Sequence, residues 1–168
     1  SAMDCPVAVI VYGQNGSVIE QWYDSATGKK SYYTTWESRI TAAGGKISAL
    51  IWWQGEGDML GARTKAAYKL DLDALIAQIR TDYGATVPVV MPNLGRYTDV
   101  SAVDADMEAI RDAQVDTCND SARNYGITTI QYALDDVIHF GDAGQLGISA
   151  RLAKLAFSTT GTLSVRPA

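Results

Sequence analysis

The feature that most constrains the fold is the alternation of short apolar runs with segments of helical length. The apolar runs are rich in Val and Ile and cover residues 7–12, 47–53, 87–91 and 127–131. The longer segments cover residues 33–43, 64–83, 103–125 and 143–157. Strands that are apolar on both faces and separated by helices are typical of a parallel sheet covered on both sides. The pattern therefore predicts a three-layer α/β/α sandwich with a mostly parallel sheet, whose ligands bind at the carboxyl ends of the strands.

The size of the chain corresponds to one domain, because 168 residues can bury about two-thirds of the surface of the unfolded chain. We expect the domain to span residues 4–158, after a cloning remnant at 1–3 and before a tail or linker at 159–168. The net charge of −5, without a cluster of Lys and Arg, argues against nucleic acid or an anionic membrane as a partner. The apolar runs are too short to span a bilayer. These features leave the cellular compartment open.

The two cysteines, Cys5 and Cys118, lie far apart and lack the spacing of metal ligands. We interpret them as buried or incidental thiols, with a disulfide between them as the open alternative. Nothing in the sequence implies a metal or an organic cofactor.

Polar clusters directly follow the predicted strands. They comprise residues 13–17, 54–58, 93–96 and 132–139. Because the carboxyl ends of parallel strands meet at one edge of a sheet, we expect these clusters to converge on one rim.

His139 is the only histidine of the chain, and Asp136 precedes it by three residues. In a turn, the Asp136 carboxylate can accept a hydrogen bond from Nδ1–H, which leaves Nε2 free to act as a base. A lone histidine is more often a surface or core residue, and an aspartate in this position commonly forms a turn. The D-x-x-H spacing is therefore weak evidence when taken alone.

The stretch Gln54-Gly55-Glu56-Gly57-Asp58 ends an apolar run abruptly. The Gln54 amide is a neutral donor that can stabilise an oxyanion, and glycine allows a ligand to approach the backbone closely. The alternative is a strand end followed by a Glu that caps a turn. Residues 13–17 are either a tight turn or a loop whose Gly16 and Ser17 amides point into the same cleft. This loop lacks the lysine of a phosphate-binding loop.

Taken together, three stretches resemble the sialate O-acetylesterase branch of the SGNH hydrolases, which includes carbohydrate acetylesterases. They are PVAVIVYGQNGSVIEQW (6–22), the run ending WWQGEGD (47–58) and DDVIHFGDAGQLGISARLA (135–153). The W-x-Q-G-E pattern in the second stretch is the most specific match. The resemblance runs from about residue 6 to residue 157 in family order.

This resemblance implies an SGNH-type, flavodoxin-like sheet and the hydrolysis of O-acetyl esters on sialic acid or a polysaccharide unit. It makes His139 the general base and Asp136 the residue that orients it. Gln54 and the Gly16 amide would stabilise the oxyanion, with Gly55 beside them and Glu56 supporting the site from behind. Aromatic rings for sugar stacking are available among Trp22, Trp52 and Trp53, although a core position is the alternative reading for Trp52 and Trp53.

One departure from the family concerns the nucleophile. The family begins with a strand that ends in a GQSN-type block, whose serine attacks the ester, and no such block stands upstream of Val7. The serine could come from an upstream segment or a second chain that completes the sheet. Ser17 is the candidate nucleophile within this chain. A missing internal strand would expose unpaired edges, so we expect the sheet to close up, swap or be completed in trans.

Two other classes of function compete with an esterase. A domain derived from such an enzyme can bind glycan or support assembly without catalysis. A flavodoxin-like nucleotide-binding domain is disfavoured, because the first loop lacks phosphate-binding spacing.

Overall fold

The computed structural model of the protein describes residues 8–99 and 104–159. Its main sheet has three parallel strands in the order β3-β4-β5. These are β3 (Leu50–Ile51), β4 (Val89–Pro92) and β5 (Asn124–Ile127). In the register, Val89 of β4 lies opposite Leu50 on one side and Asn124 on the other.

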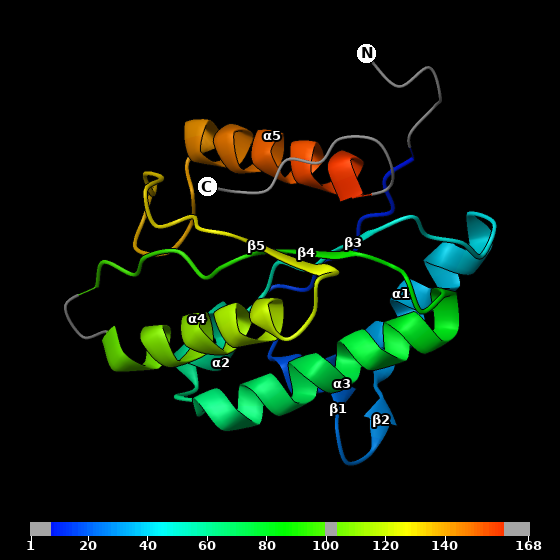
Figure 1. The fold of residues 1–168 in the computed structure, drawn as a ribbon. Helices are drawn as coiled ribbons and strands as arrows, with labels where there is room; N and C mark the ends of the chain where they lie inside the picture. The colour runs from blue at the N-terminus through cyan, green and yellow to red at the C-terminus, as the bar shows by residue number, and fades with distance from the viewer. Residues whose placement is uncertain (1–7, 100–103, 160–168) are drawn as a thin grey trace.

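Helices cover both faces of this sheet, as Figure 1 shows. The helices are α1 (Ser31–Ala42), α2 (Glu56–Leu60), α3 (Lys65–Tyr83), α4 (Asp104–Asn119) and α5 (Asp142–Thr159). Helix α5 lies over one face, and α3 and α4 lie over the other (Figure 1). The predicted three-layer α/β/α sandwich with a parallel sheet is therefore confirmed.

The core forms on both faces of β4, because successive side chains of a strand point to opposite sides. Val89 and Met91 pack in the larger cluster with Leu75 of α3 and Ile110 of α4. Val90 packs in the smaller cluster, whose buried members from other segments are Ile127, Phe140, Ile148 and Leu152. Burial on both faces explains why this strand reads as a continuous apolar run.

A small antiparallel hairpin precedes α1 and was not predicted. It consists of β1 (Tyr23–Asp24) and β2 (Gly28–Lys29), and the 3₁₀ turn Ile19–Gln21 leads into it. The Asp71 carboxylate of α3 accepts a hydrogen bond from the Ser25 N–H (2.7 Å), which holds the hairpin against that helix. Strands this short carry little periodicity for a sequence pattern to reveal.

The strand predicted at residues 7–12 is wrong for the part that the structure describes. Residues 8–12 contain no strand, and the side chains of Val9 and Val11 are 75% and 71% exposed. Strand β3 bonds to β4 along one edge, and no described strand pairs with its other edge. Residues 8–12 therefore form no backbone hydrogen bonds with a described strand.

Several predicted bounds also differ from the structure. The strand predicted at 47–53 shrinks to β3, and the strand predicted at 127–131 lies earlier, as β5. The helix predicted to reach residue 125 ends at Asn119. The chain turns after it, where the Asn124 N–H donates to the Ser121 carbonyl (3.0 Å), and Asn124 then pairs with β4. The helices predicted at 33–43, 64–83 and 143–157 are confirmed with small shifts of their ends.

Some predictions fall outside the described residues. These include the remnant at 1–3, Cys5 with any pairing to Cys118, and all of the predicted tail except Thr159, where α5 ends. Burial raises the pKa of the Cys118 thiol to about 12, so the thiol is protonated and unreactive at neutral pH. Among the described helices, none combines the length and apolarity that a membrane crossing requires.

Candidate active site

The turn that carries His139 follows β5 and precedes α5. His139 Nδ1 lies 2.7 Å from Oδ2 of Asp136. The other carboxylate oxygen accepts the backbone N–H groups of Ile138 (2.8 Å) and His139 (2.7 Å). The turn is closed by a bridge between Leu134 and Phe140. The predicted Asp136–His139 contact is therefore present.

The electrostatics of this turn favour an ionised acid beside the imidazole. The His139 and Ile138 backbone N–H groups, followed by the imidazole, lower the pKa of Asp136 to about 2. The carboxylate stays charged at neutral pH and can hold Nδ1 protonated, which leaves Nε2 as the acceptor. The His139 side chain is 72% exposed, so its ring is open to an incoming group.

Glu56 opens α2 at the end of β3. Burial raises the pKa of its carboxyl group, while its own backbone N–H and the charge of His139 lower it. Trp53 and Phe140 are the sequence neighbours of Gln54 and His139, and their ring centroids lie 5.9 Å apart. This contact brings the end of β3 next to the turn that carries His139.

Gln54 is buried, and its side chain ties neighbouring segments together. Its Nε2 donates to the Ser17 carbonyl (2.8 Å) and to Oδ2 of Asp58 (2.6 Å). Its backbone carbonyl accepts from Gln114 Nε2 (2.9 Å) and from the Tyr68 hydroxyl (3.0 Å). Both amide hydrogens of Gln54 are therefore engaged within the protein, an arrangement that fixes the loop containing Gly16.

The glycines of the QGEGD stretch permit close packing within the protein. A Cβ on Gly57 would lie 2.5 Å from the Ser17 carbonyl oxygen and 3.0 Å from that of Gly16. Gly55 has φ +150°, and a Cβ there would lie 3.0 Å from Ile110 and 3.2 Å from Gln114 Nε2. The sequence correctly marks a close backbone approach, but the approaching groups in this structure are other parts of the chain.

Ser17 lies next to Gln54, but its hydroxyl is directed into the core. The residue is 7% exposed, and its Oγ accepts a hydrogen bond from Trp22 Nε1 (3.0 Å). Its N–H bonds to the Gln14 carbonyl (3.3 Å). Gly16 is exposed, with φ +63°. Among the described residues no serine hydroxyl bonds to His139, so the structure brings Gly16, Ser17 and Gln54 together without joining Ser17 to the histidine.

Buried polar residues outside the predicted set complete this arrangement. Asp58 accepts the Ile19 N–H (2.9 Å) as well as the Gln54 amide, and burial raises its pKa. Gln114 of α4 accepts the Leu94 N–H (2.6 Å) and donates to Gln54. Gln114 thus links the ends of β3 and β4. Asp58 belongs to the QGEGD stretch that the sequence marks as unusual. Gln114 is a single Gln inside a helix, and no sequence pattern distinguishes it.

The aromatic candidates divide by burial. Trp22 and Trp52 belong to the core, with their rings 5.4 Å apart, whereas Trp53 is 37% exposed at the rim. Across the described ranges, no group of three or more His, Cys, Asp or Glu side chains is placed to hold a metal ion.

Solved structures of other proteins share this fold. A protein of Arabidopsis thaliana matches with a TM-score of 0.70 and 21% identity, over 87% of this chain and 58% of its own. A carbohydrate acetylesterase of Xanthomonas citri matches with a TM-score of 0.68 and 22% identity, over 88% of this chain and 36% of its own. At 21–22% identity, these likenesses show a shared fold.

The sequence itself gives the family. Residues 2–158 match the carbohydrate esterases described as sialic acid-specific acetylesterases, and the chain belongs to this family. A probable carbohydrate esterase of Arabidopsis thaliana is 29% identical over 98 residues, which cover 55% of this chain and 37% of the relative. The chain thus spans well under two-thirds of the length of these relatives.

Proposed function

We propose that this chain supplies the general base and its orienting acid for hydrolysis of O-acetyl esters on a carbohydrate. The observation that carries the proposal is the Asp136–His139 pair, with 2.7 Å between Oδ2 and Nδ1 and an exposed imidazole. Membership of the carbohydrate esterase family supports the substrate class. The sugar is sialic acid or a unit of an acetylated polysaccharide.

In the proposed reaction, His139 Nε2 removes the proton from a serine hydroxyl as the serine oxygen attacks the acetyl carbonyl carbon. Asp136 stabilises the imidazolium that forms. The imidazolium then gives its proton to the sugar oxygen, which leaves as a hydroxyl group. Water attacks the acetyl-serine in the second half, with His139 again acting as base, and acetate is released. The backbone N–H of Gly16, an exposed residue, is the candidate donor to the oxyanion.

We assign the serine to a segment that completes the sheet at β3. The described bonds of this strand run to β4, from Leu50 N–H to Pro88 (3.0 Å) and from Trp52 N–H to Val90 (2.9 Å). Ile51 is 44% exposed, and the exposed Val9 and Val11 add apolar surface to the described chain. An unpaired apolar edge favours the addition of a strand. An upstream segment or a second chain is the source that we propose.

The test compares acetate release by a longer polypeptide, which includes the segment before residue 4, with release by its His139→Ala variant. We expect the variant to lose at least about two orders of magnitude in turnover, because the chain has no second histidine. Equal turnover by both proteins would refute the assignment of His139 as base. Binding of acetylated sugar without turnover by the longer polypeptide would instead support a glycan-binding domain.

A further inference from the structure

The turn at residues 14–17 contains the only Asn-Gly pair of the sequence, Asn15-Gly16. None of the other three asparagines, Asn93, Asn119 and Asn124, precedes a glycine. An asparagine followed by glycine can lose its side-chain amide when the glycine nitrogen attacks Cγ, because the glycine has no side chain to hinder the approach. The pair is therefore a candidate site for a spontaneous covalent change.

The turn leaves both reacting groups accessible. Asn15 and Gly16 are exposed, and within the described chain the Asn15 side chain forms no hydrogen bond. Gly16 has φ +63°, and a Cβ placed on it would meet no atom within 4 Å. The bond that closes the turn, from the Ser17 N–H to the Gln14 carbonyl, is long at 3.3 Å. The Asn15 amide can therefore approach the Gly16 nitrogen without displacing a packed side chain.

The remaining asparagines differ from Asn15 in burial or in the residue that follows. Asn93 and Asn124 are buried, and Asn124 Nδ2 donates to the Thr117 carbonyl (2.6 Å). Asn119 is exposed at the end of α4. Asn119 therefore serves as a reference within the same chain, an exposed asparagine without a following glycine.

The nitrogen that would attack is also the candidate donor to the oxyanion. The described contacts of this turn with the QGEGD stretch are made by its carbonyl groups. A Cβ on Gly57 would lie 3.0 Å from the Gly16 carbonyl oxygen, and the Ser17 carbonyl accepts Gln54 Nε2 (2.8 Å). No described hydrogen bond engages the Gly16 N–H. The same N–H is thus free for an oxyanion and for the covalent change.

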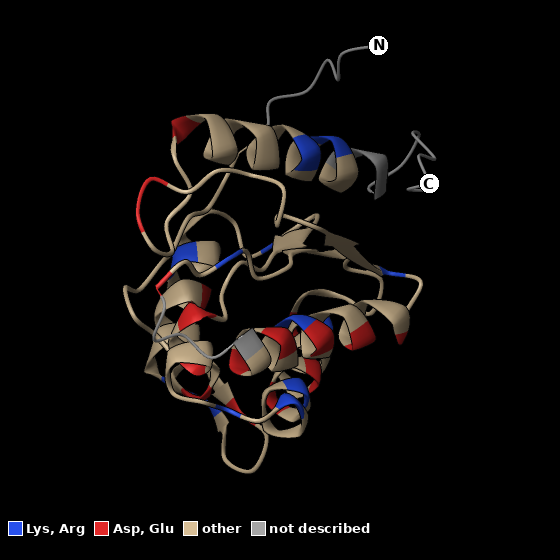
Figure 2. Cartoon of the chain, turned by 90° about the vertical axis from the view of Figure 1, so that its left-hand side faces the viewer, with Lys and Arg blue, Asp and Glu red and all other residues tan. Residues whose placement is uncertain are grey.

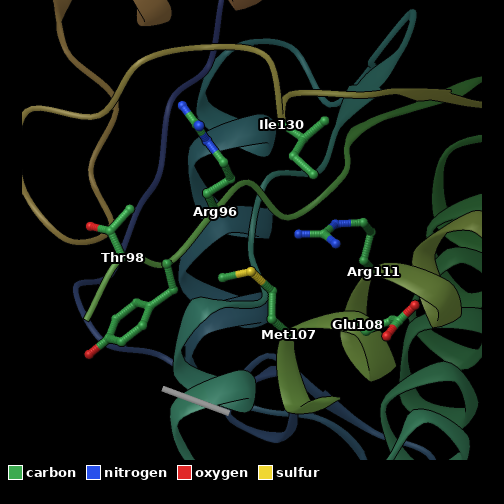
Figure 3. Close-up of a pocket in the computed structure, with 7 residues that line it drawn as sticks. Arg96, Thr98, Met107, Glu108, Arg111 and Ile130 are labelled. Carbon is green, nitrogen blue, oxygen red and sulfur yellow. The ribbon is translucent and has the colours of Figure 1, made fainter. Parts of the chain in front are cut away.

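An acid formed in this turn would stand in uncharged surroundings. Residues 8–19 include no charged side chain and are drawn in tan in Figure 2. Among the described residues, no lysine or arginine bonds to residues 13–17, and Arg39 bonds to a carbonyl that precedes them. Arg96 and Arg111 line a hollow of about 310 Å³ after β4 and donate to carbonyls there (Figure 3). A new carboxylate would therefore oppose a neighbouring oxyanion without a paired cation to offset it.

We infer that Asn15 is a site of spontaneous deamidation and that this change removes the oxyanion donor of the esterase. The Gly16 nitrogen bonds to Cγ of Asn15, the Cγ–Nδ2 bond breaks, and the proton of the Gly16 N–H leaves with Nδ2 as ammonia. Water then opens the cyclic imide at either of its carbonyl carbons, which gives aspartate or isoaspartate at this position and restores the proton to the nitrogen.

Each form of the modified turn disturbs the oxyanion donor in its own way. The imide has no N–H at Gly16. Isoaspartate adds a carbon to the main chain and displaces Gly16, whereas aspartate keeps the backbone and adds a negative charge. This consequence for catalysis rests on the proposed function, but the covalent change does not.

The covalent change is tested on the 168-residue chain, incubated at mildly alkaline pH and digested for mass spectrometry. We expect the peptide with Asn15 to change from amide to acid at least about tenfold faster than the peptide with Asn119. Isoaspartate, detected with an isoaspartyl methyltransferase, should form together with aspartate. Asn15→Gln should stop the change at this position, because the longer side chain would have to close a larger ring. Equal rates at Asn15 and Asn119, or aspartate without isoaspartate, would overturn the inference.

The consequence is tested on a longer polypeptide with esterase activity, incubated beside its Asn15→Gln variant. Acetate release by the unsubstituted protein should fall in parallel with the appearance of imide and isoaspartate, whereas the variant should keep its turnover. Undiminished turnover after complete modification would contradict the loss of the oxyanion donor. Failure of the proposed function would appear instead as unchanged turnover in the His139 variant.

Discussion

At the scale of single residues, the site depends on one short turn. Asp136 receives two backbone N–H groups and the His139 ring within four positions, so most of the geometry is local. Local geometry is what a sequence pattern can predict, and the D-x-x-H spacing did predict this contact. The position of Ser17 could not be predicted in the same way, because its hydroxyl bonds to the Trp22 indole inside the core.

The lowered pKa of Asp136 predicts how the turn responds to acid. The pKa of about 2 lies below the ordinary value of 3.8. The charged carboxylate therefore stabilises the folded turn fully when the pH is above about 3.8. This contribution should be lost as the pH falls from about 3.8 towards 2. An NMR titration of the Asp136 carboxyl carbon checks the prediction, and a midpoint at or above 3.8 would contradict it.

Replacing Asp136 by Asn tests its role separately from the backbone of the turn. The amide oxygen of Asn can still accept the Ile138 and His139 N–H groups, but the negative charge beside Nδ1 is lost. In a polypeptide with esterase activity, we expect turnover to fall by at least about two orders of magnitude while the fold is kept. Circular dichroism and acetate release measure the two effects, and full activity in Asp136→Asn would disprove the orienting role.

Ser17→Ala distinguishes a structural serine from a nucleophile. The change leaves the buried Trp22 N–H without its acceptor, so we expect a loss of about 1–3 kcal/mol in the free energy of unfolding. Activity in a competent polypeptide should persist. Denaturant unfolding gives the first value and acetate release the second. Loss of all activity with unchanged stability would make Ser17 the nucleophile.

At the scale of secondary structure, the rim is held by contacts between elements far apart in sequence. Gln114 of α4 connects Gln54 after β3 with Leu94 after β4, and Gly57 of α2 packs against the Gly16–Ser17 backbone. The alternating apolar runs predicted which elements exist. They could not predict that β5 would be the Asn124–Ile127 segment. Its position is set by the pairing with β4 and by the hydrogen bond from the Asn124 side chain to the Thr117 carbonyl.

A pair of glycines in and after α2 tests the packing of this element. A Cβ on Gly57 would meet the Ser17 carbonyl oxygen at 2.5 Å, whereas a Cβ on Gly61 would find its nearest neighbour at 3.4 Å. We expect Gly57→Ala to destabilise the fold by about 1–3 kcal/mol and Gly61→Ala to change it by less than about 1 kcal/mol. Thermal unfolding of the two variants measures this difference. An equal fall in the two melting temperatures would contradict the close packing of Gly57 against the Ser17 backbone.

At the scale of the whole molecule, the predicted sandwich is present, but no strand that the structure describes pairs with the second edge of β3. The sequence correctly predicted an α/β/α arrangement, because β4 is buried on both faces and helices separate the strands. It placed a strand at residues 7–12, where exposed Val9 and Val11 are found instead. Apolar residues show that a segment can be buried. A strand also requires a neighbouring strand with which its backbone forms hydrogen bonds.

The measurement that tests the central claim most directly is labelling with a serine-reactive fluorophosphonate, followed by mass spectrometry of the labelled peptide. The reagent modifies a serine only when a neighbouring base activates it. In a longer polypeptide that completes the sheet at β3, we predict a label on a serine outside residues 8–159, and no label in the His139→Ala variant. A label on Ser17, or labelling that persists without His139, would contradict the account.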